Sequence, residues 1–319
     1  MLERMTRWQA LKRAMGPRAK ELRFTLHRIK QNPLSIIGLA LIFFFVILAI
    51  LAPYLIKVVT PDLAPGPGDD PYIIPRDSFE QTPQPPSPAH PWGTTQGQYD
   101  IFYGMMMGVR TAFRVGIFVV GIAIVVGLVL GAVAGYYGGA IDEVIMRIVD
   151  IFMAFPALIL AMALITVLGT GLNNVMIAVV IVWWPGYVRL IRGDILSVRE
   201  EGYVEAAKAL GARDPRIMFR HIIPNAIYPL LVLASMDIGS VVLVAAALSF
   251  LGLGAGANYA DWGGMISIAR NWITGLPGQP YAFWYTVAIP GIFIFLFVLG
   301  WNLLGDAFRD IIDPKVRRR

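Results

Sequence analysis

The residues best suited to chemistry with a partner lie between Arg199 and Pro224, in a stretch that reads REEGYVEAAKALGARDPRIMFRHIIP. Apolar sequence flanks it on both sides, from Asn174 to Ile191 and from Ile227 to Leu251. Charged groups are costly inside a bilayer, so a charged segment between two apolar segments of membrane length must lie in water. We therefore expect a water-exposed loop that offers acidic and basic groups to another molecule.

The order of residues in this loop predicts a short helix. The run Glu205–Ala207 favours a helical turn, and Gly211 is placed to end it, because glycine tolerates the left-handed conformation found after helix C-termini. Pro215 and Pro224 then limit where a second helix can run. The expected product is a helix lying across the membrane surface, with a small alanine face that another protein can approach and a glutamate that can meet a positive charge.

Asp237 is the second candidate, because it falls inside an otherwise apolar stretch. A carboxylate at the bilayer centre costs about 3 kcal/mol or more and is seldom left facing lipid. We expect it to face the helix bundle, a water-filled path or a positive partner. Two interpretations stay open: a group that lines a substrate path and attracts an amino terminus or cation, or a packed, hydrogen-bonded or protonated structural acid.

Several kinds of chemistry have no support in the sequence. There is no cysteine, which excludes disulfides and thiolate sites. The histidines, His27, His90 and His221, are scattered without metal-ligand spacing. No phosphate-binding Gly-x-x-x-x-Gly-Lys-Ser/Thr loop and no hydrolase or metalloprotease motif occurs. We therefore predict that the chain is not an enzyme and itself binds no cofactor or metal.

Composition indicates an integral membrane protein. Hydrophobic residues make up 57% of the chain and charged residues only 15%, whereas soluble domains carry about 25% charged residues. The net charge of +6 comes from residues gathered at the two ends and in the central loop, next to apolar spans. That distribution is a signal of membrane topology and not of nucleic-acid binding.

The apolar runs predict an all-α protein with six transmembrane helices. We place the spans at about 34–56, 112–136, 144–168, 175–190, 227–251 and 283–304, since about 20 apolar residues cross a bilayer core. The predicted regions are a basic cytoplasmic tail (1–32), a first transmembrane helix (33–57), an outer loop with an interfacial segment (58–110), a core (111–306) with the charged loop at 194–224, and a second cytoplasmic tail (307–319).

Three local expectations follow from these boundaries. The outer loop is rich in proline, so we expect extended chain without a packed core, either a spacer or a contact for an external receptor protein, or else a tolerated insertion. Asp100 to Arg114 is expected to form a separate interfacial helix, which leaves Arg110 and Arg114 on the outer side against the usual charge rule. Pro156 is expected to kink the third span, and the glycines of the second span are expected to serve helix packing.

The spacing of Glu205–Ala207, Gly211 and His221–Asn225 resembles the cytoplasmic loop in the membrane subunits of bacterial ATP-driven importers. The general pattern there is Glu-Ala-Ala, three residues, Gly, nine residues, Ile, one residue, Leu-Pro. This chain has His221 at the Ile position and Ile223 at the Leu position, which looks like the dipeptide, oligopeptide and nickel branch. Other stretches that resemble this branch are His90–Thr95, Gly135–Gly139, Leu248–Gly254, Asn302–Asp306 and Asp310–Pro314.

The resemblance implies a type I ABC importer permease fold in a bacterial or archaeal inner membrane, with both termini cytoplasmic. It implies a second homologous permease subunit, two ATPase subunits that hold ATP and Mg²⁺, and an extracytoplasmic solute-binding protein. In the family this loop is the coupling helix that docks on the ATPase, so coupling roles are implied for Glu205, Ala206, Ala207, Gly211, His221 and Pro224. Peptides are the expected substrate, with nickel complexes or other small solutes as alternatives. A stand-alone ion-gradient transporter or channel is the competing class.

Overall fold

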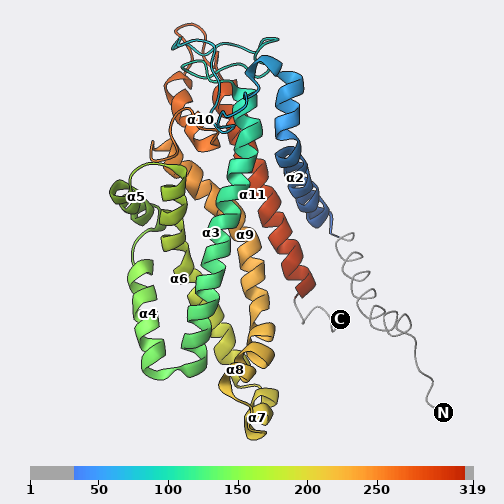
Figure 1. The fold of residues 1–319 in the computed structure, drawn as a ribbon, viewed down its shortest axis with the longest axis vertical. Coiled ribbons are helices and arrows are strands. Elements are labelled where there is room, and N and C mark those ends of the chain that lie inside the picture. Colours follow the sequence, from blue (N-terminus) through green and yellow to red (C-terminus); the bar gives the residue numbers. More distant parts are fainter. Residues whose placement is uncertain (1–31, 313–319) are drawn as a thin grey trace, which may run out of the picture.

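The computed structural model describes residues 32–312, which form a bundle of long helices without a β-strand in that range. The tail predicted at 1–32 therefore lies outside the described residues except for Asn32. Of the tail predicted at 307–319, residues 307–312 continue α11 and only residues 313–319 lie outside. Five of the described helices are long and apolar enough to cross a membrane, and a bent helix pair makes a sixth candidate. The long helices are α2 (Pro33–Val59), α3 (Ile101–Tyr137), α6 (Leu172–Arg199), α9 (Ile223–Phe250) and α11 (Tyr285–Ile312) (Figure 1).

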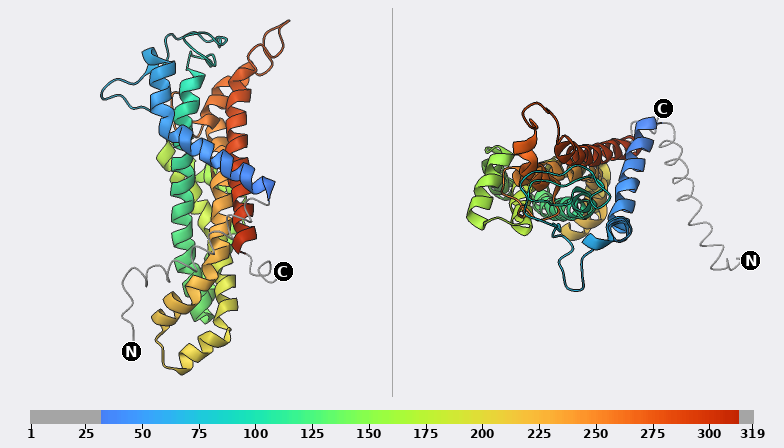
Figure 2. Two further views of the ribbon diagram at one scale, coloured as in Figure 1. Left: turned by 90° about the vertical axis from the view of Figure 1, so that its right-hand side faces the viewer. Right: turned by 90° about the horizontal axis from the view of Figure 1, so that it is seen from above.

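Shorter elements connect them. They are η1 (Pro61–Leu63), α4 (Gly139–Met153), α5 (Ala157–Leu168), α7 (Gly202–Ala209), α8 (Asp214–Ile217), the π-helical turn η2 (Met218–Ile222), α10 (Trp262–Ala269) and η3 (Arg270–Trp272). Seen along and across the bundle, α3 runs through its length, α4 and α5 lie at one side, and α2 crosses the other side obliquely (Figures 1 and 2).

The prediction of a separate interfacial helix before the second span is wrong. α3 is one helix of 37 residues, about 55 Å long. It begins where the Asp100 carboxylate accepts a hydrogen bond of 2.6 Å from the backbone N–H of Tyr103. No proline interrupts the run, and residues 101–109 are all buried, so this part of the helix is enclosed by protein and does not lie at a water interface.

The predicted kink at Pro156 is a complete break. α4 and α5 meet at an angle of 88° instead of forming one straight third span. Pro156 has extended backbone at the start of α5, and a proline also disfavours helical conformation in the residue before it. Both helices pack against α6.

The proline-rich outer segment also differs from its prediction, because residues 60–100 fold into a compact layer, here called the outer cap. Its backbone pairs with distant segments: Ile74 N–H donates to the carbonyl of Asn258 at 2.7 Å, and Ile101 N–H donates to that of Gly93 at 3.1 Å. The His90 ring lies between two carboxylates, 2.7 Å from Asp100 and 3.1 Å from Asp77. Burial raises the pKa of Asp100 above its usual value. Long-range pairs of this kind cannot be read from proline content.

The membrane part of the core depends on close contact between α3 and α6. A Cβ atom added to Gly127, Gly131 or Gly135 would lie 2.3 Å from Tyr187 Cβ, 1.9 Å from Ile191 Cγ2 and 2.9 Å from Ile195 Cγ2, respectively. We call these three glycines and the α6 residues opposite them the glycine seam. The prediction that these glycines serve helix packing is confirmed, whereas Gly121 of the same helix has no atom within 4 Å of such a Cβ.

Replacing Gly131 with alanine is expected to destabilise the protein, because the added methyl group would also meet the backbone oxygen of Val188 at 2.8 Å, which cannot rotate away. Overpacking of this kind costs about 1–3 kcal/mol. The measurement is thermal unfolding of the purified protein in detergent. Gly121→Ala is the matched control and should leave the midpoint unchanged; an equal fall in both variants would contradict the role of the seam.

Candidate coupling segment and intramembrane carboxylate

The segment between α6 and α9, residues 200–222, is here called the coupling segment, and it lies at the opposite end of the bundle from the outer cap (Figure 1). Its α7 helix is anchored by Val204 and Ala207, which are buried one turn apart. Glu205 and Ala206 are exposed on the other side. The alanine pair expected on one docking face is therefore divided, because successive helix positions are rotated by about 100°: Ala206 faces out and Ala207 packs inward.

Gly211 ends α7 as predicted. Its φ of 78° lies in the left-handed region. The Gly211 N–H donates to the carbonyl of Lys208 at 2.9 Å, and the Ala212 N–H donates to that of Ala207 at 3.1 Å. This is the Schellman arrangement, in which a glycine after the helix satisfies the last carbonyl groups. The helix is thus kept short, and Leu210 follows it at an exposed position.

Large apolar side chains are exposed on this segment, and the sequence interpretation did not identify them. Leu210 is 87% exposed and Phe219 is 70% exposed. Tyr203, on the first turn of α7, is also exposed. The sequence signal that could have identified them is the presence of large apolar residues inside a charged loop. An exposed apolar group next to charges in water is typical of a protein contact.

His221 and Pro224 lie where the chain re-enters the bundle. His221 is half-buried within the π-helical turn η2, and Pro224 lies in the first turn of α9. Proline has no N–H to donate, so the helical ladder is interrupted there. The His221 carbonyl accepts hydrogen bonds from two side chains, the Asn225 amide at 2.7 Å and the Tyr203 hydroxyl at 3.4 Å. π-helical turns of this kind occur frequently at functional sites.

Hydrogen bonds join the coupling segment to the C-terminal end of α3. The Tyr136 hydroxyl donates to Asp214 at 2.7 Å. Arg199 donates to the backbone carbonyls of Tyr136 and Gly135 at 2.8 Å and 3.3 Å. These carbonyls belong to the last turn of α3, where no helical N–H follows to pair with them. The chain is therefore attached to α3 on both sides of α7, through Arg199 at the end of α6 and through Asp214 in α8.

Two ion pairs hold α4 against α6 on the same side. Arg192 binds Asp142 with two parallel hydrogen bonds, at 2.5 Å and 2.6 Å, and Arg189 pairs with Asp150. The paired geometry of a guanidinium and a carboxylate fixes orientation as well as distance. All four residues are charged groups at the ends of predicted spans, but their pairing is not visible in the sequence.

Asp237 lies on α9 and faces the bundle, as expected. Trp183 of α6 donates its ring N–H to one Asp237 oxygen at 3.0 Å. Tyr187, one turn further along α6, is close to the same carboxylate, but its buried hydroxyl forms no hydrogen bond with the described residues. Asp237 is half-buried. It is separate from the coupling segment, so the predicted residues form two sites: Glu205, Ala206, Ala207, Gly211, His221 and Pro224 near the inner end, and Asp237 between α6 and α9.

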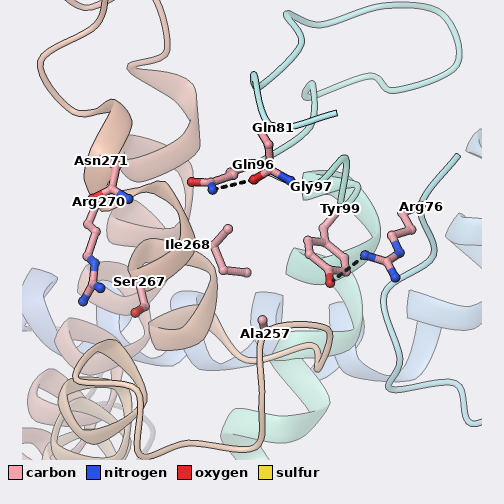
Figure 3. A pocket seen from close by; sticks show the side chains of 10 residues that line it. All are labelled: Arg76, Gln81, Gln96, Gly97, Tyr99, Ala257, Ser267, Ile268, Arg270 and Asn271. Carbon is pink, nitrogen blue, oxygen red and sulfur yellow. Dashed lines mark hydrogen bonds between the residues drawn. The ribbon is translucent and has the colours of Figure 1, made fainter. Parts of the chain in front are cut away.

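At the outer end, a pocket of about 350 Å³ lies between the outer cap and the α10–η3 region (Figure 3). Arg76, on the cap side, is bonded to the Tyr99 hydroxyl at 3.3 Å, and Arg270 stands on the opposite wall. Between them lie the amides of Gln81 and Gln96, which bond to each other at 2.8 Å. The pocket presents cationic and amide groups to the outside, a set that suits carboxylates.

Comparison with known proteins agrees with this arrangement. The family described as binding-protein-dependent transport system inner membrane component matches residues 127–318. The family described as the N-terminal TM domain of oligopeptide transport permease C matches residues 22–86.

Curated relatives extend the match over most of the chain. The dipeptide transport system permease protein DppC of Alkalihalophilus pseudofirmus is 41% identical over 91% of this chain and 88% of its own length. The probable D,D-dipeptide transport system permease protein DdpC of Escherichia coli is 39% identical over 90% and 89%. The glutathione transport system permease protein GsiD of Pectobacterium atrosepticum is 40% identical over 77% and 81%.

Among solved structures, an inward-facing form of the MetNI methionine ABC transporter matches with a TM-score of 0.52 at 18% identity, over 66% of this chain and 97% of the matched chain. At that identity the match shows the fold, which is that of type I importer permeases. The family match over residues 127–318 and the relatives above 30% identity place the chain by sequence. This chain belongs to the family of inner membrane components of binding-protein-dependent transport systems and is a permease of the dipeptide and oligopeptide branch.

Proposed function

We propose that this chain forms half of the translocation path of an importer for short peptides and that separate ATPase subunits drive it. The relatives named above carry dipeptides, D,D-dipeptides and glutathione in their names, which supports peptides over nickel complexes. A second homologous permease subunit supplies the other half of the path. ATP and Mg²⁺ are held by the two ATPase subunits, not by this chain.

The observation that carries the proposal is the surface of α7. A small exposed surface is formed by Glu205, Ala206 and Leu210, of which Leu210 is 87% exposed. Glu205 supplies a negative charge, the small Ala206 side chain allows a partner to approach closely, and Leu210 offers an apolar contact. Apolar residues that fill a partner's pocket supply much of the energy of an interface. The Schellman turn at Gly211 fixes the direction of Leu210. We infer that this surface docks into a groove of an ATPase subunit.

The orientation of the chain in the membrane is inferred from the distribution of its basic side chains. Basic side chains gather at the α7 end of the bundle, among them Arg192, Arg199, Lys208 and Arg213. Such an excess marks the cytoplasmic side of a membrane protein. The outer cap then faces the extracytoplasmic side, and both termini are cytoplasmic. We infer that a solute-binding protein docks on the cap, where the pocket between Arg76 and Arg270 suits carboxylates on its surface.

The hydrogen bonds to α3 give the coupling segment a mechanical role. A displacement of α7 by the ATPase pair would be carried by Asp214 and Arg199 to the inner end of α3, and along the helical path Asp214–Phe250 to the region of Asp237. An equilibrium between inward and outward states shifts only when a ligand binds the two unequally. ATP-driven closure of the partner subunits supplies that difference.

Asp237 is proposed to line the substrate path. A half-buried carboxylate between α6 and α9 attracts the amino terminus of a peptide, while the bond from Trp183 holds its orientation. Intramembrane carboxylates are typical of substrate or ion pathways.

Glu205→Lys is expected to abolish peptide uptake while the protein still reaches the membrane, because reversing this charge opposes docking. Gly211→Asp should have the same result, since a side chain at a φ of 78° is strained by about 1 kcal/mol and the turn that directs Leu210 is lost. Uptake of a labelled dipeptide and co-purification of the ATPase subunits are the measurements. Glu200→Lys, an exposed glutamate at the end of α6, is the control. Full transport with both changes would refute the docking role.

Tyr136→Phe, Asp214→Asn and the double variant test the link to α3. We expect the ATPase subunits to co-purify normally, because the α7 surface is unchanged, but transport per ATP hydrolysed should fall several-fold. A hydrogen bond to a charged group is worth about 1.5–3 kcal/mol, and less at an exposed position. The double variant should be no worse than either single one. Tyr137→Phe, at an exposed neighbouring tyrosine, is the control, and additive losses would show that the two groups act independently.

Asp237→Asn is expected to change the rate of peptide uptake several-fold, because it removes the negative charge and keeps the shape of the side chain. The size of this change should differ between peptides with free and with blocked amino termini. Trp183→Phe removes the hydrogen-bond donor and keeps the carboxylate, so its effect on peptide preference should be smaller. Initial rates with a small set of peptides give the comparison. If Asp237→Asn leaves the kinetics of all of them unchanged, the carboxylate has only a packing role.

A further inference from the structure

Arg110, in the outer part of α3, has no role in the coupling scheme and no partner in the described part of the chain. It is half-buried, and it forms no ion pair or hydrogen bond with any of residues 32–312. Arg114, one turn further along the helix, is instead satisfied by the Asn173 side chain at 3.2 Å. A half-buried guanidinium without an anion is unusual, because partial burial removes some of its hydration.

Arg110 opens into a groove between α2 and α3. The groove has a volume of about 650 Å³ and is lined by Ala49, Ile50, Pro53, Tyr54, Tyr72, Arg110 and Phe113. Apart from the guanidinium and two tyrosine hydroxyls its side chains are apolar. α2 changes direction along its length (Figure 2), and Pro53, inside that helix, has no N–H for the carbonyl of Ala49. α2 therefore lacks one backbone hydrogen bond beside the groove.

The groove lies at the outer edge of the bilayer. From Arg114 to Tyr137, α3 is about 35 Å long, close to the thickness of a hydrocarbon core of about 30 Å. Arg110 is one turn beyond that length, next to the outer cap. Tyr54, which lines the groove, is 69% exposed on the outer surface of α2, and tyrosines are enriched where lipid headgroups meet acyl chains.

We propose that this groove binds a phospholipid of the outer leaflet. The phosphodiester lies on Arg110, whose planar guanidinium matches phosphate oxygens. One acyl chain covers the apolar wall formed by Ile50, Pro53 and Phe113. Ile50 is 65% exposed, so the wall opens sideways toward the bilayer and not only toward water. The phosphate of the lipid supplies the anion that the guanidinium lacks. Its acyl chain covers the exposed apolar face of α2.

The test uses the full-length chain purified with its partner subunits in detergent and then delipidated in steps. Native mass spectrometry counts the phospholipids that remain bound. We expect Arg110→Gln to retain about one phospholipid fewer per chain than the unmodified protein, and phosphatidylglycerol added back to bind it at least tenfold more weakly. Arg114→Gln removes the same charge one turn away and should keep the lipid.

A second variant protects the test from a folding defect. Ile50→Trp fills the groove while Arg110 is unchanged, and it should lose the same lipid. Equal retention in Arg110→Gln and the unmodified protein would overturn the proposal. So would saturable binding of inorganic phosphate by the delipidated protein with no binding of phosphatidylglycerol, because the site would then recognise a free anion and not a lipid.

Discussion

The close approach of α3 and α6 at the glycine seam is the constraint on which the rest of the structure depends. Inside a bilayer the surrounding lipid is as apolar as the helices, so association relies on dispersion contacts between surfaces that fit. Here the Ile191 methyl group occupies the space that a Cβ on Gly131 would need. Contact of this kind fixes the relative height of the two helices, because a shift along the axis would bring larger side chains against each other.

The fixed axial position of α3 relative to α6 determines which side chains are in contact at the C-terminal end of α3. Gly135 packs against Ile195, and four residues later on α6 Arg199 reaches the carbonyls of Gly135 and Tyr136. The last turn of α3 is thereby capped by a side chain of α6. Tyr136 is then in position to donate a hydrogen bond to Asp214. The position of α8, which begins at Asp214, is therefore also fixed relative to α3. The position of the coupling segment is a consequence of the packing of α3 against α6, not of the segment alone.

The parts of this structure that the sequence predicts are those set by local chemistry. Glu205–Ala207 followed by Gly211 is enough to predict α7 and its end, because capping involves residues within one turn. The burial of Ala207 was missed because it depends on which side of α7 faces the bundle. The bond between Tyr136 and Asp214 joins residues 78 positions apart, and no local pattern reports such a pair. The outer cap was missed for the same reason, since backbone pairs with distant segments hold it together. The outer part of α3 was assigned to a separate interfacial helix because its burial by distant residues is not visible in the sequence.

Tyr187 connects the seam with the intramembrane carboxylate. Its Cβ packs where a side chain on Gly127 would lie, and its ring lies near Asp237. The environment of Asp237 therefore depends on α3, α6 and α9 together. Asp237 lies about 24 Å along the helix from His221, where the π-helical turn and Pro224 loosen the backbone ladder. Pro229, inside α9, interrupts the ladder once more before Asp237, so the helix can change direction at either of these two positions. Movement of the coupling segment would consequently reach Asp237 as a change in the tilt of α9 against α6, and the bond to Trp183 is the contact that such a tilt would break first.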